Sequence, residues 1–66
     1  MKISLNGQAR ELDGGKTLDQ IIEQFCKETK HVIAEVNGEI VKAKAWQETR
    51  VKDGDAVELV SIVGGG

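Results

Sequence analysis

Few side chains in this sequence of 66 residues belong to types that do nucleophilic or acid–base chemistry, and their spacing argues against a catalytic site. Cys26 falls on the apolar face of a predicted helix, whereas a reactive thiol needs an exposed, electropositive setting. His31 has no carboxylate or serine spaced to orient it. One Cys and one His cannot supply the four ligands of a structural zinc site. We therefore expect Cys26 in the core, His31 on the surface, and no enzyme active site.

Two loop segments have the composition of ligand sites without the required spacing. Residues 53–55 (Asp-Gly-Asp) lack the further oxygen ligands and the terminal Glu of a calcium loop, so a tight turn is the better interpretation. Residues 14–17 (GGKT) resemble the end of a phosphate-binding loop, but the first Gly of that motif would fall at Arg10. We interpret this second segment as the connection that leads into a helix.

The last residues, Gly64, Gly65 and Gly66, offer a different kind of chemistry. A strand that ends in glycines projects a thin thread, which can enter a narrow tunnel that any Cβ would block. The Gly66 carboxylate could then be activated by ATP-dependent adenylation and transferred to an amine, a thiol or a sulfide. The alternatives are a disordered end or a cloning remnant. We expect Gly66 to be the reactive residue, delivered into the active site of another protein.

Composition excludes several classes of partner. Nine Lys and Arg residues stand against eleven Asp and Glu residues, so no large basic patch is available for nucleic acid. No apolar run approaches the ~18 residues that span a bilayer. The start, MKISLNGQ, turns polar too early for a signal peptide. We expect a cytoplasmic protein that is monomeric alone, binds neither nucleic acid nor membrane, and folds on an aliphatic core.

Apolar periodicity and turn residues predict the elements. We expect strands over residues 2–6, 8–13, 31–37, 39–41 and 56–63 and a helix over 18–29, with residues 42–49 ambiguous but compatible with a short helical turn. Asn6-Gly7 and Asn37-Gly38 favour two-residue hairpin turns, because both residue types tolerate positive φ. Thr17 and Gln20 have the spacing of a capping box at the helix start.

The element order predicts an α+β fold of the β-grasp (ubiquitin-like) type. It consists of a mixed sheet of four to five strands with one helix packed across it. The first and last strands should lie side by side in the middle. We expect residues 1–63 to form this single domain and residues 64–66 to form a flexible tail.

Strand parity predicts a partner-binding face. In the last strand one face carries Val57, Leu59, Ser61 and Val63, and the other carries Ala56, Glu58, Val60 and Ile62. The face with Glu58 should be solvated, which leaves Val60 and Ile62 as exposed apolar residues before the glycines. Ile33 likewise shares a face with Glu35. We expect Val60, Ile62 and Ile33 to bind a partner, although scattered surface aliphatics are an equal alternative.

The sequence resembles the sulfur carrier family of thiamine biosynthesis, the ThiS family, over its whole length. The resemblance rests on Val36-Asn37-Gly38, on Trp46, on residues 53–60 (DGDAVELV) and on the ending VGGG at 63–66. The last two pieces together are the most specific. The family has the β-grasp fold that the element order predicts.

The resemblance implies a carrier that is a recycled co-substrate, not an enzyme, and that binds no cofactor of its own. A ThiF-type adenylyltransferase would use ATP and Mg²⁺ to adenylate Gly66. A cysteine desulfurase relay would supply sulfur to form a thiocarboxylate, and a ThiG-type thiazole synthase would take that sulfur into the thiazole of thiamine. The alternatives are a carrier for molybdopterin or another thiolated product, a ubiquitin-like modifier with Gly66 in an isopeptide bond, or a plain interaction module.

Overall fold

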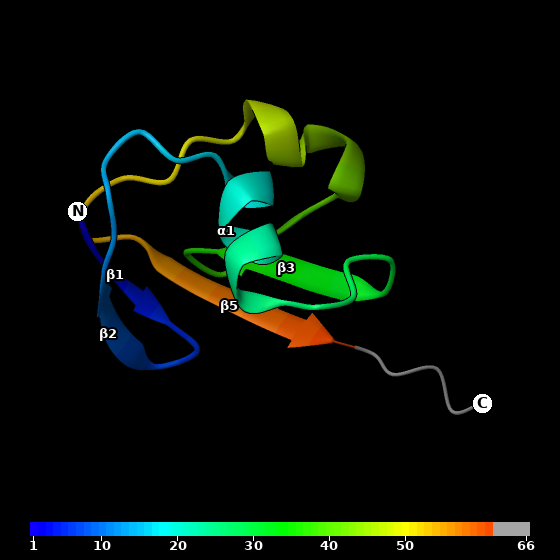
Figure 1. Cartoon of the computed structure of the whole chain (residues 1–66), viewed down its shortest axis with the longest axis horizontal. Coiled ribbons are helices and arrows are strands. Elements are labelled where there is room, and N and C mark those ends of the chain that lie inside the picture. Colours follow the sequence, from blue (N-terminus) through cyan, green and yellow to red (C-terminus); the bar gives the residue numbers. More distant parts are fainter. Residues whose placement is uncertain (62–66) are drawn as a thin grey trace.

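The computed structural model describes residues 1–61 and shows one mixed sheet with helices packed against it (Figure 1). The elements in this part of the chain are β1 (Lys2–Leu5), β2 (Gln8–Glu11), α1 (Leu18–Phe25), β3 (Val32–Val36), β4 (Glu39–Val41), the 3₁₀ helix η1 (Ala43–Glu48) and β5 (Ala56–Ser61). The strand order is β2-β1-β5-β3-β4. β5 therefore lies at the centre, parallel to β1 and antiparallel to β3. The predicted β-grasp order, with the first and last strands adjacent, is confirmed.

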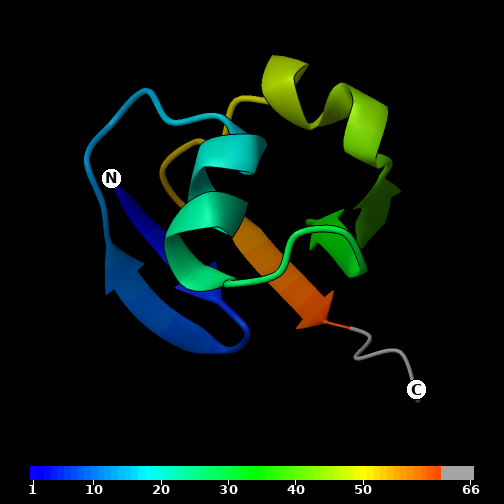
Figure 2. The same ribbon diagram turned by 45° about the vertical axis from the view of Figure 1, so that its right-hand side comes forward.

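Helix α1 lies across the centre of the sheet, as Figures 1 and 2 show. Its Leu18, Ile21 and Ile22 are buried, at the spacing of one apolar helix face. They belong to a single core of buried residues, which is Ile3, Leu5, Leu18, Ile21, Ile22, Val32, Ala34, Trp46, Val51, Val57 and Leu59. All but Trp46 are aliphatic. The core thus joins the helix to the central strands β1, β5 and β3.

Both Asn-Gly pairs form the predicted hairpin turns. Asn6 and Gly7 have φ values of 51° and 82°, and Asn37 and Gly38 have φ values of 54° and 84°. Two successive positive φ angles define the type I′ turn, whose twist matches that of the flanking strands. These turns connect β1 to β2 and β3 to β4, and so fix the register of both hairpins.

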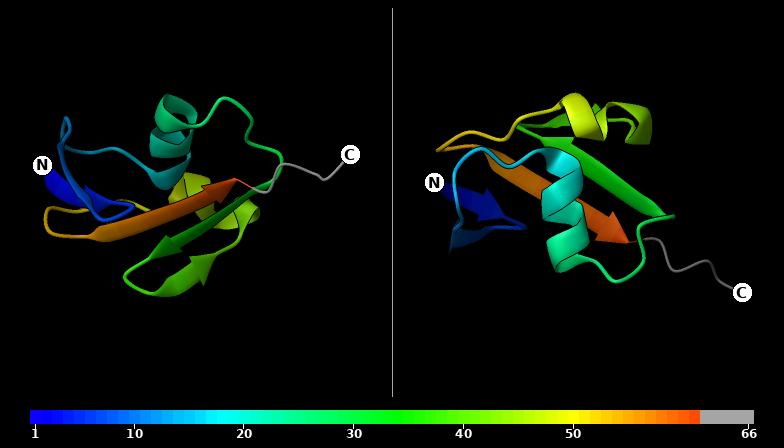
Figure 3. Two further views of the ribbon diagram at one scale, coloured as in Figure 1. Left: turned by 90° about the horizontal axis from the view of Figure 1, so that it is seen from below. Right: turned by 45° about the horizontal axis from the view of Figure 1, so that its top comes forward.

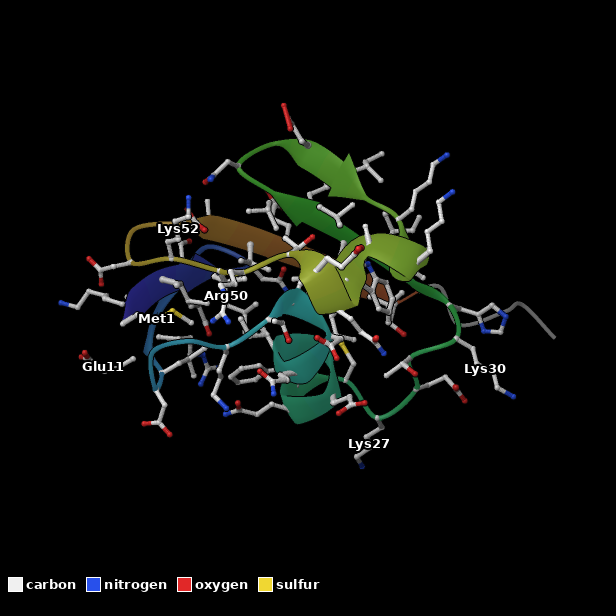
Figure 4. All side chains as sticks on the ribbon, turned by 90° about the horizontal axis from the view of Figure 1, so that it is seen from above. Met1, Glu11, Lys27, Lys30, Arg50 and Lys52 are labelled. Carbon is white, nitrogen blue, oxygen red and sulfur yellow. The ribbon has the colours of Figure 1, made fainter. Side chains whose placement is uncertain are left out.

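Helix α1 is shorter than the predicted 18–29 span. It ends at Phe25, and Cys26 is extended, with φ −122° and ψ 129°. The apolar residues needed to hold a further turn are missing, because residues 27, 28 and 30 are charged and exposed. Lys27 and Lys30 consequently lie in the connection to β3 rather than in the last helical turn (Figure 4). The predicted start is right: the Thr17 N–H donates to Gln20 Oε1 at 2.9 Å.

The ambiguous segment before β5 forms the short helix η1. Its Trp46 is buried, and the indole Nε1–H donates to the Val41 carbonyl at 2.8 Å. Strand β2 ends at Glu11, two residues before the predicted end, while β5 follows its prediction as far as Ser61, the last described residue. Neither helix within residues 1–61 has the length and apolar character needed to cross a membrane.

Candidate functional site

Strand β5 is the element that leads toward the predicted reactive end, and neighbouring strands hold it on both sides. On one side β1 pairs with its first two residues, Ala56 and Val57. On the other side β3 pairs with every position from Val57 to Ser61. The second half of β5 therefore has a strand partner on only one side.

The side chain of Asn6 takes the place of a strand on the other side. β1 ends at Leu5, and the Asn6 amide then reaches Leu59. Its Oδ1 accepts a hydrogen bond from the Leu59 N–H at 2.8 Å, and its Nδ2 donates to the Leu59 carbonyl at 3.3 Å. A side-chain amide carries one acceptor and a donor group, as a peptide does. Asn6 thus continues the β1–β5 pairing beyond the end of β1.

The second turn asparagine, Asn37, holds the start of β5. Its Oδ1 accepts from the Ala56 N–H at 2.9 Å, and its own N–H donates to the Ala56 carbonyl at 2.7 Å. Its Nδ2 donates to Asp55 Oδ1 at 3.1 Å. The sequence pattern indicated only the turn role of the two asparagines. Their contacts with β5 join residues far apart in the chain, so no local signal reports them.

Ile33 and Val60 form an exposed apolar pair on the sheet. They lie opposite each other in the β3–β5 register, and their side chains are 40% and 55% exposed. Figure 3 shows the two strands side by side in both views. Their strand neighbours Ala34 and Leu59 are buried on the face that packs against α1. Since successive side chains alternate between faces, Ile33 and Val60 point away from the helix, and the predicted exposure of both is confirmed.

A third apolar residue of this face, Ile40, was not among the predicted site residues. It is 68% exposed and lies opposite Glu35 in the β3–β4 register. A usable signal was present, because a two-residue turn at Asn37-Gly38 fixes that pairing. We call the surface made by Ile33, Glu35, Ile40, Glu58 and Val60 the outer face.

The remaining predicted site residues, Ile62, Gly64, Gly65 and Gly66, lie outside the described residues 1–61. Their roles stay predictions. Of the predicted set, the structure brings together Ile33 and Val60.

The residues for which we expected no catalytic or ligand-binding role are Cys26, His31 and the two aspartates of residues 53–55. They either support the fold or lie on the surface. Cys26 is half-buried and packs against the core, while His31 is exposed. In the turn before β5, Asp53 Oδ1 accepts from the Lys2 N–H at 2.7 Å, and Asp55 Oδ2 accepts from the Lys52 N–H at 2.8 Å. Both carboxylates thus bond to the backbone, and the predicted tight turn is confirmed.

Comparison with known proteins identifies relatives that match all or nearly all of the chain. The model of the ThiS family matches residues 3–66. The sulfur carrier protein ThiS of Escherichia coli (strain K12) is 30% identical over 66 residues, which is 100% of both chains. The sulfur carrier protein ThiS of Thermus thermophilus is 37% identical over 62 residues, which is 94% of this chain and 95% of that protein.

Two further matches are a solved structure with the same fold and a larger protein that contains a similar segment. A crystal structure of the thiamine biosynthesis protein ThiS from Geobacter metallireducens superposes with a TM-score of 0.84 at 33% identity, covering 100% of both chains. A thiazole synthase of Paramagnetospirillum magneticum is 32% identical over 66 residues, but the chain spans only 20% of that protein.

Proposed function

The chain belongs to the ThiS family, and we propose that it is a sulfur carrier of thiamine biosynthesis rather than an enzyme. The observation that carries this proposal is the end-to-end match to a sulfur carrier protein, with 100% of both chains aligned. The fold agrees with it, since the ThiS crystal structure superposes over its full length. A carrier needs a folded body that partners recognise and one group that holds the cargo.

We place the cargo on the carboxylate of Gly66. The family match extends to this residue, which supports the assignment. A carboxylate resists nucleophiles until it is activated. In the proposed cycle a ThiF-type adenylyltransferase uses ATP and Mg²⁺: a Gly66 carboxylate oxygen attacks the α-phosphorus, pyrophosphate leaves, and an acyl-adenylate results. Sulfide then attacks the acyl carbon, AMP leaves, and Gly66 ends in a thiocarboxylate.

The proposed acceptor is a ThiG-type thiazole synthase, which takes the sulfur into the thiazole ring and returns Gly66 as a carboxylate. The similarity of the whole chain to one-fifth of a thiazole synthase supports this pairing, because that protein contains a carrier-like segment within its own chain. The proposed sulfur source is a cysteine desulfurase relay, whose persulfide sulfur is released as sulfide when a thiol reductant supplies two electrons and is itself oxidised to a disulfide. We place the cycle in the cytoplasm, where ATP is available.

The outer face is the proposed docking surface for these enzymes. It carries Ile33, Ile40 and Val60 as the large exposed hydrophobic side chains of the described residues. Exposed apolar residues gathered on one face are typical of protein–protein contacts. Val60 lies in the strand that leads toward Gly66, so a partner bound here would have its active site near the cargo. By strand parity we add Ile62 to this surface.

Complementation tests the proposed function. The chain is expressed in an E. coli strain that lacks its own ThiS, and growth is measured without thiamine. We expect growth with the full chain and none with a variant that lacks Gly65 and Gly66. Failure of the full chain to restore growth, when it is folded and co-expressed with adenylyltransferase and thiazole synthase from its own source, would contradict the proposal.

A further inference from the structure

Two carboxylates of the outer face oppose each other directly. Glu35 of β3 and Glu58 of β5 are cross-strand partners. Side chains in this relation have Cβ atoms about 4.5–5.5 Å apart, and like charges placed so are destabilising. Glu35 is half-buried and Glu58 is exposed. The β3–β5 register therefore places two like-charged side chains next to each other at the centre of the sheet.

The residues next to this pair on the same face are uncharged. Along the strands these are Ile33, Ala56 and Val60, and across from Glu35 on β4 lies Ile40. Lys42, the nearest cation along β4, follows the last paired residue of that strand and has the same parity as Ile40, so it lies diagonal to Glu35. Lys27, Lys30 and Arg50 lie in the connection after α1 and in the segment after η1 (Figure 4). Within residues 1–61, no cation is therefore the direct cross-strand partner of Glu35 or Glu58 or the next residue on the same face along β3 or β5.

We propose that Glu35 and Glu58 receive an arginine side chain of the adenylating partner, an inference that rests on the proposed carrier function. A guanidinium has five N–H donors in a planar fork, so it can bond both carboxylates at once. It is also more weakly hydrated than an ammonium, and its aliphatic stem packs on apolar surface. The flanking Ile33, Val60 and Ile40 supply that surface.

Docking then turns an unfavourable contact into a favourable one. The two carboxylates repel each other in the free carrier, and a cation between them reverses the sign of the local interaction. Complementary charge of this kind steers association and rejects partners without the matching cation. Glu35 and Glu58 are in this account specificity-determining residues for docking, and neither takes part in the chemistry at Gly66.

The test compares two double variants with the same change in net charge. Glu35→Gln/Glu58→Gln removes the outer-face pair. Glu23→Gln/Glu48→Gln alters exposed residues of α1 and η1. Binding to a ThiF-type adenylyltransferase is measured by calorimetry without ATP, at two salt concentrations. We expect the outer-face variant to raise the dissociation constant about tenfold to a hundredfold and to weaken its salt dependence, while the control keeps the wild-type affinity.

A measurement of stability distinguishes a loss of docking contacts from a folding defect of the variant. Removing the repulsion should leave the urea midpoint of Glu35→Gln/Glu58→Gln unchanged or raised. Wild-type affinity in this variant, or an equal loss in the Glu23→Gln/Glu48→Gln control, overturns the proposal. Thiocarboxylate formation on Gly66 is followed separately by mass. A chain that binds through the pair but never acquires sulfur contradicts the carrier function alone, and a chain that does not bind the enzyme contradicts both.

Discussion

Ile33 and Val60 face each other across β3 and β5, with both side chains exposed on the side of the sheet away from α1. Each is flanked along its strand by a glutamate, Glu35 or Glu58, on the same face. The apolar pair and the acidic pair are therefore neighbours on the same face of the sheet, separated in the β3–β5 register by the inward-facing pair Ala34 and Leu59. The buried core lies on the other face of the sheet, so the proposed docking residues can be altered separately from the residues that stabilise the fold.

The first prediction concerns the apolar pair. Val60→Asp should weaken docking, because it places a charge within the apolar contact. The KM for the carrier in the adenylation reaction should rise about tenfold or more, with a smaller effect on kcat. Val60 is 55% exposed, so folding should persist, as far-UV circular dichroism would verify. By parity we expect the same result for Ile62→Asp.

Ala9→Asp is the matched control for Val60→Asp. Ala9 is an exposed residue of the edge strand β2. The same carboxylate added there should leave the KM within about twofold of the wild-type value, because surface substitutions away from specific features have small effects. Equal KM values for Val60→Asp and the wild type would show that this surface does not dock the enzyme.

The second prediction concerns Asn6, whose amide makes two hydrogen bonds with Leu59. Asn6→Gly keeps the positive φ of the turn but removes both bonds. We expect the free energy of unfolding to fall by about 1–2 kcal/mol, at roughly 1 kcal/mol for each bond. Urea denaturation followed by circular dichroism measures it. Stability equal to that of the wild type would mean that the Asn6 amide does not hold β5.

The third prediction concerns Trp46 in η1. Trp46→Phe retains an aromatic ring in the core but leaves the Val41 carbonyl without its indole donor. We expect a loss of about 0.5–1.5 kcal/mol in unfolding free energy, the usual net contribution of one hydrogen bond, because this bond is only part-buried. Thermal unfolding followed by circular dichroism measures the change. An unchanged midpoint would argue that the hydrogen bond contributes nothing to stability.

The fourth prediction concerns the glycines. Removal of Gly65 and Gly66 should abolish thiocarboxylate formation and leave the unfolding free energy within about 0.5 kcal/mol of the wild-type value. The core of the described residues runs from Ile3 to Leu59, so the two residues lie six or more positions beyond its last member. Urea denaturation measures the stability. A large loss of stability would assign the glycines a structural role instead.

Much of the fold follows from local sequence. The two Asn-Gly pairs determine where the hairpins turn, and a two-residue turn also fixes which residues pair. Alternation in β5 then separates buried Val57 and Leu59 from exposed Val60. These are short-range rules, and the structure follows them.

The helix end was predicted wrongly because the pattern continues past it. Phe25 and Cys26 keep the apolar spacing, yet α1 stops at Phe25. Whether another turn forms depends on what the sheet can cover, and residues 27, 28 and 30 offer only charged side chains. Tertiary burial, which a local pattern does not report, decided the boundary.

The sequence pattern also could not predict the contacts of the site that join residues far apart in the chain. Asn6 and Leu59 are 53 positions apart, and the opposition of Glu35 to Glu58 depends on the alignment of two non-consecutive strands. Parity places each residue on a face but does not say which rung it occupies. Only the structure shows the register in which β3 pairs with β5.

The central claim is that Gly66 carries sulfur, and the most direct test is the intact mass of the purified chain. The chain is incubated with ATP, Mg²⁺, a ThiF-type adenylyltransferase and a sulfur source. We predict the mass increase of one oxygen replaced by one sulfur, located at Gly66 by fragmentation and absent when ATP is omitted. An unchanged mass, or a chain joined through Gly66 to a lysine of another protein, would contradict the account.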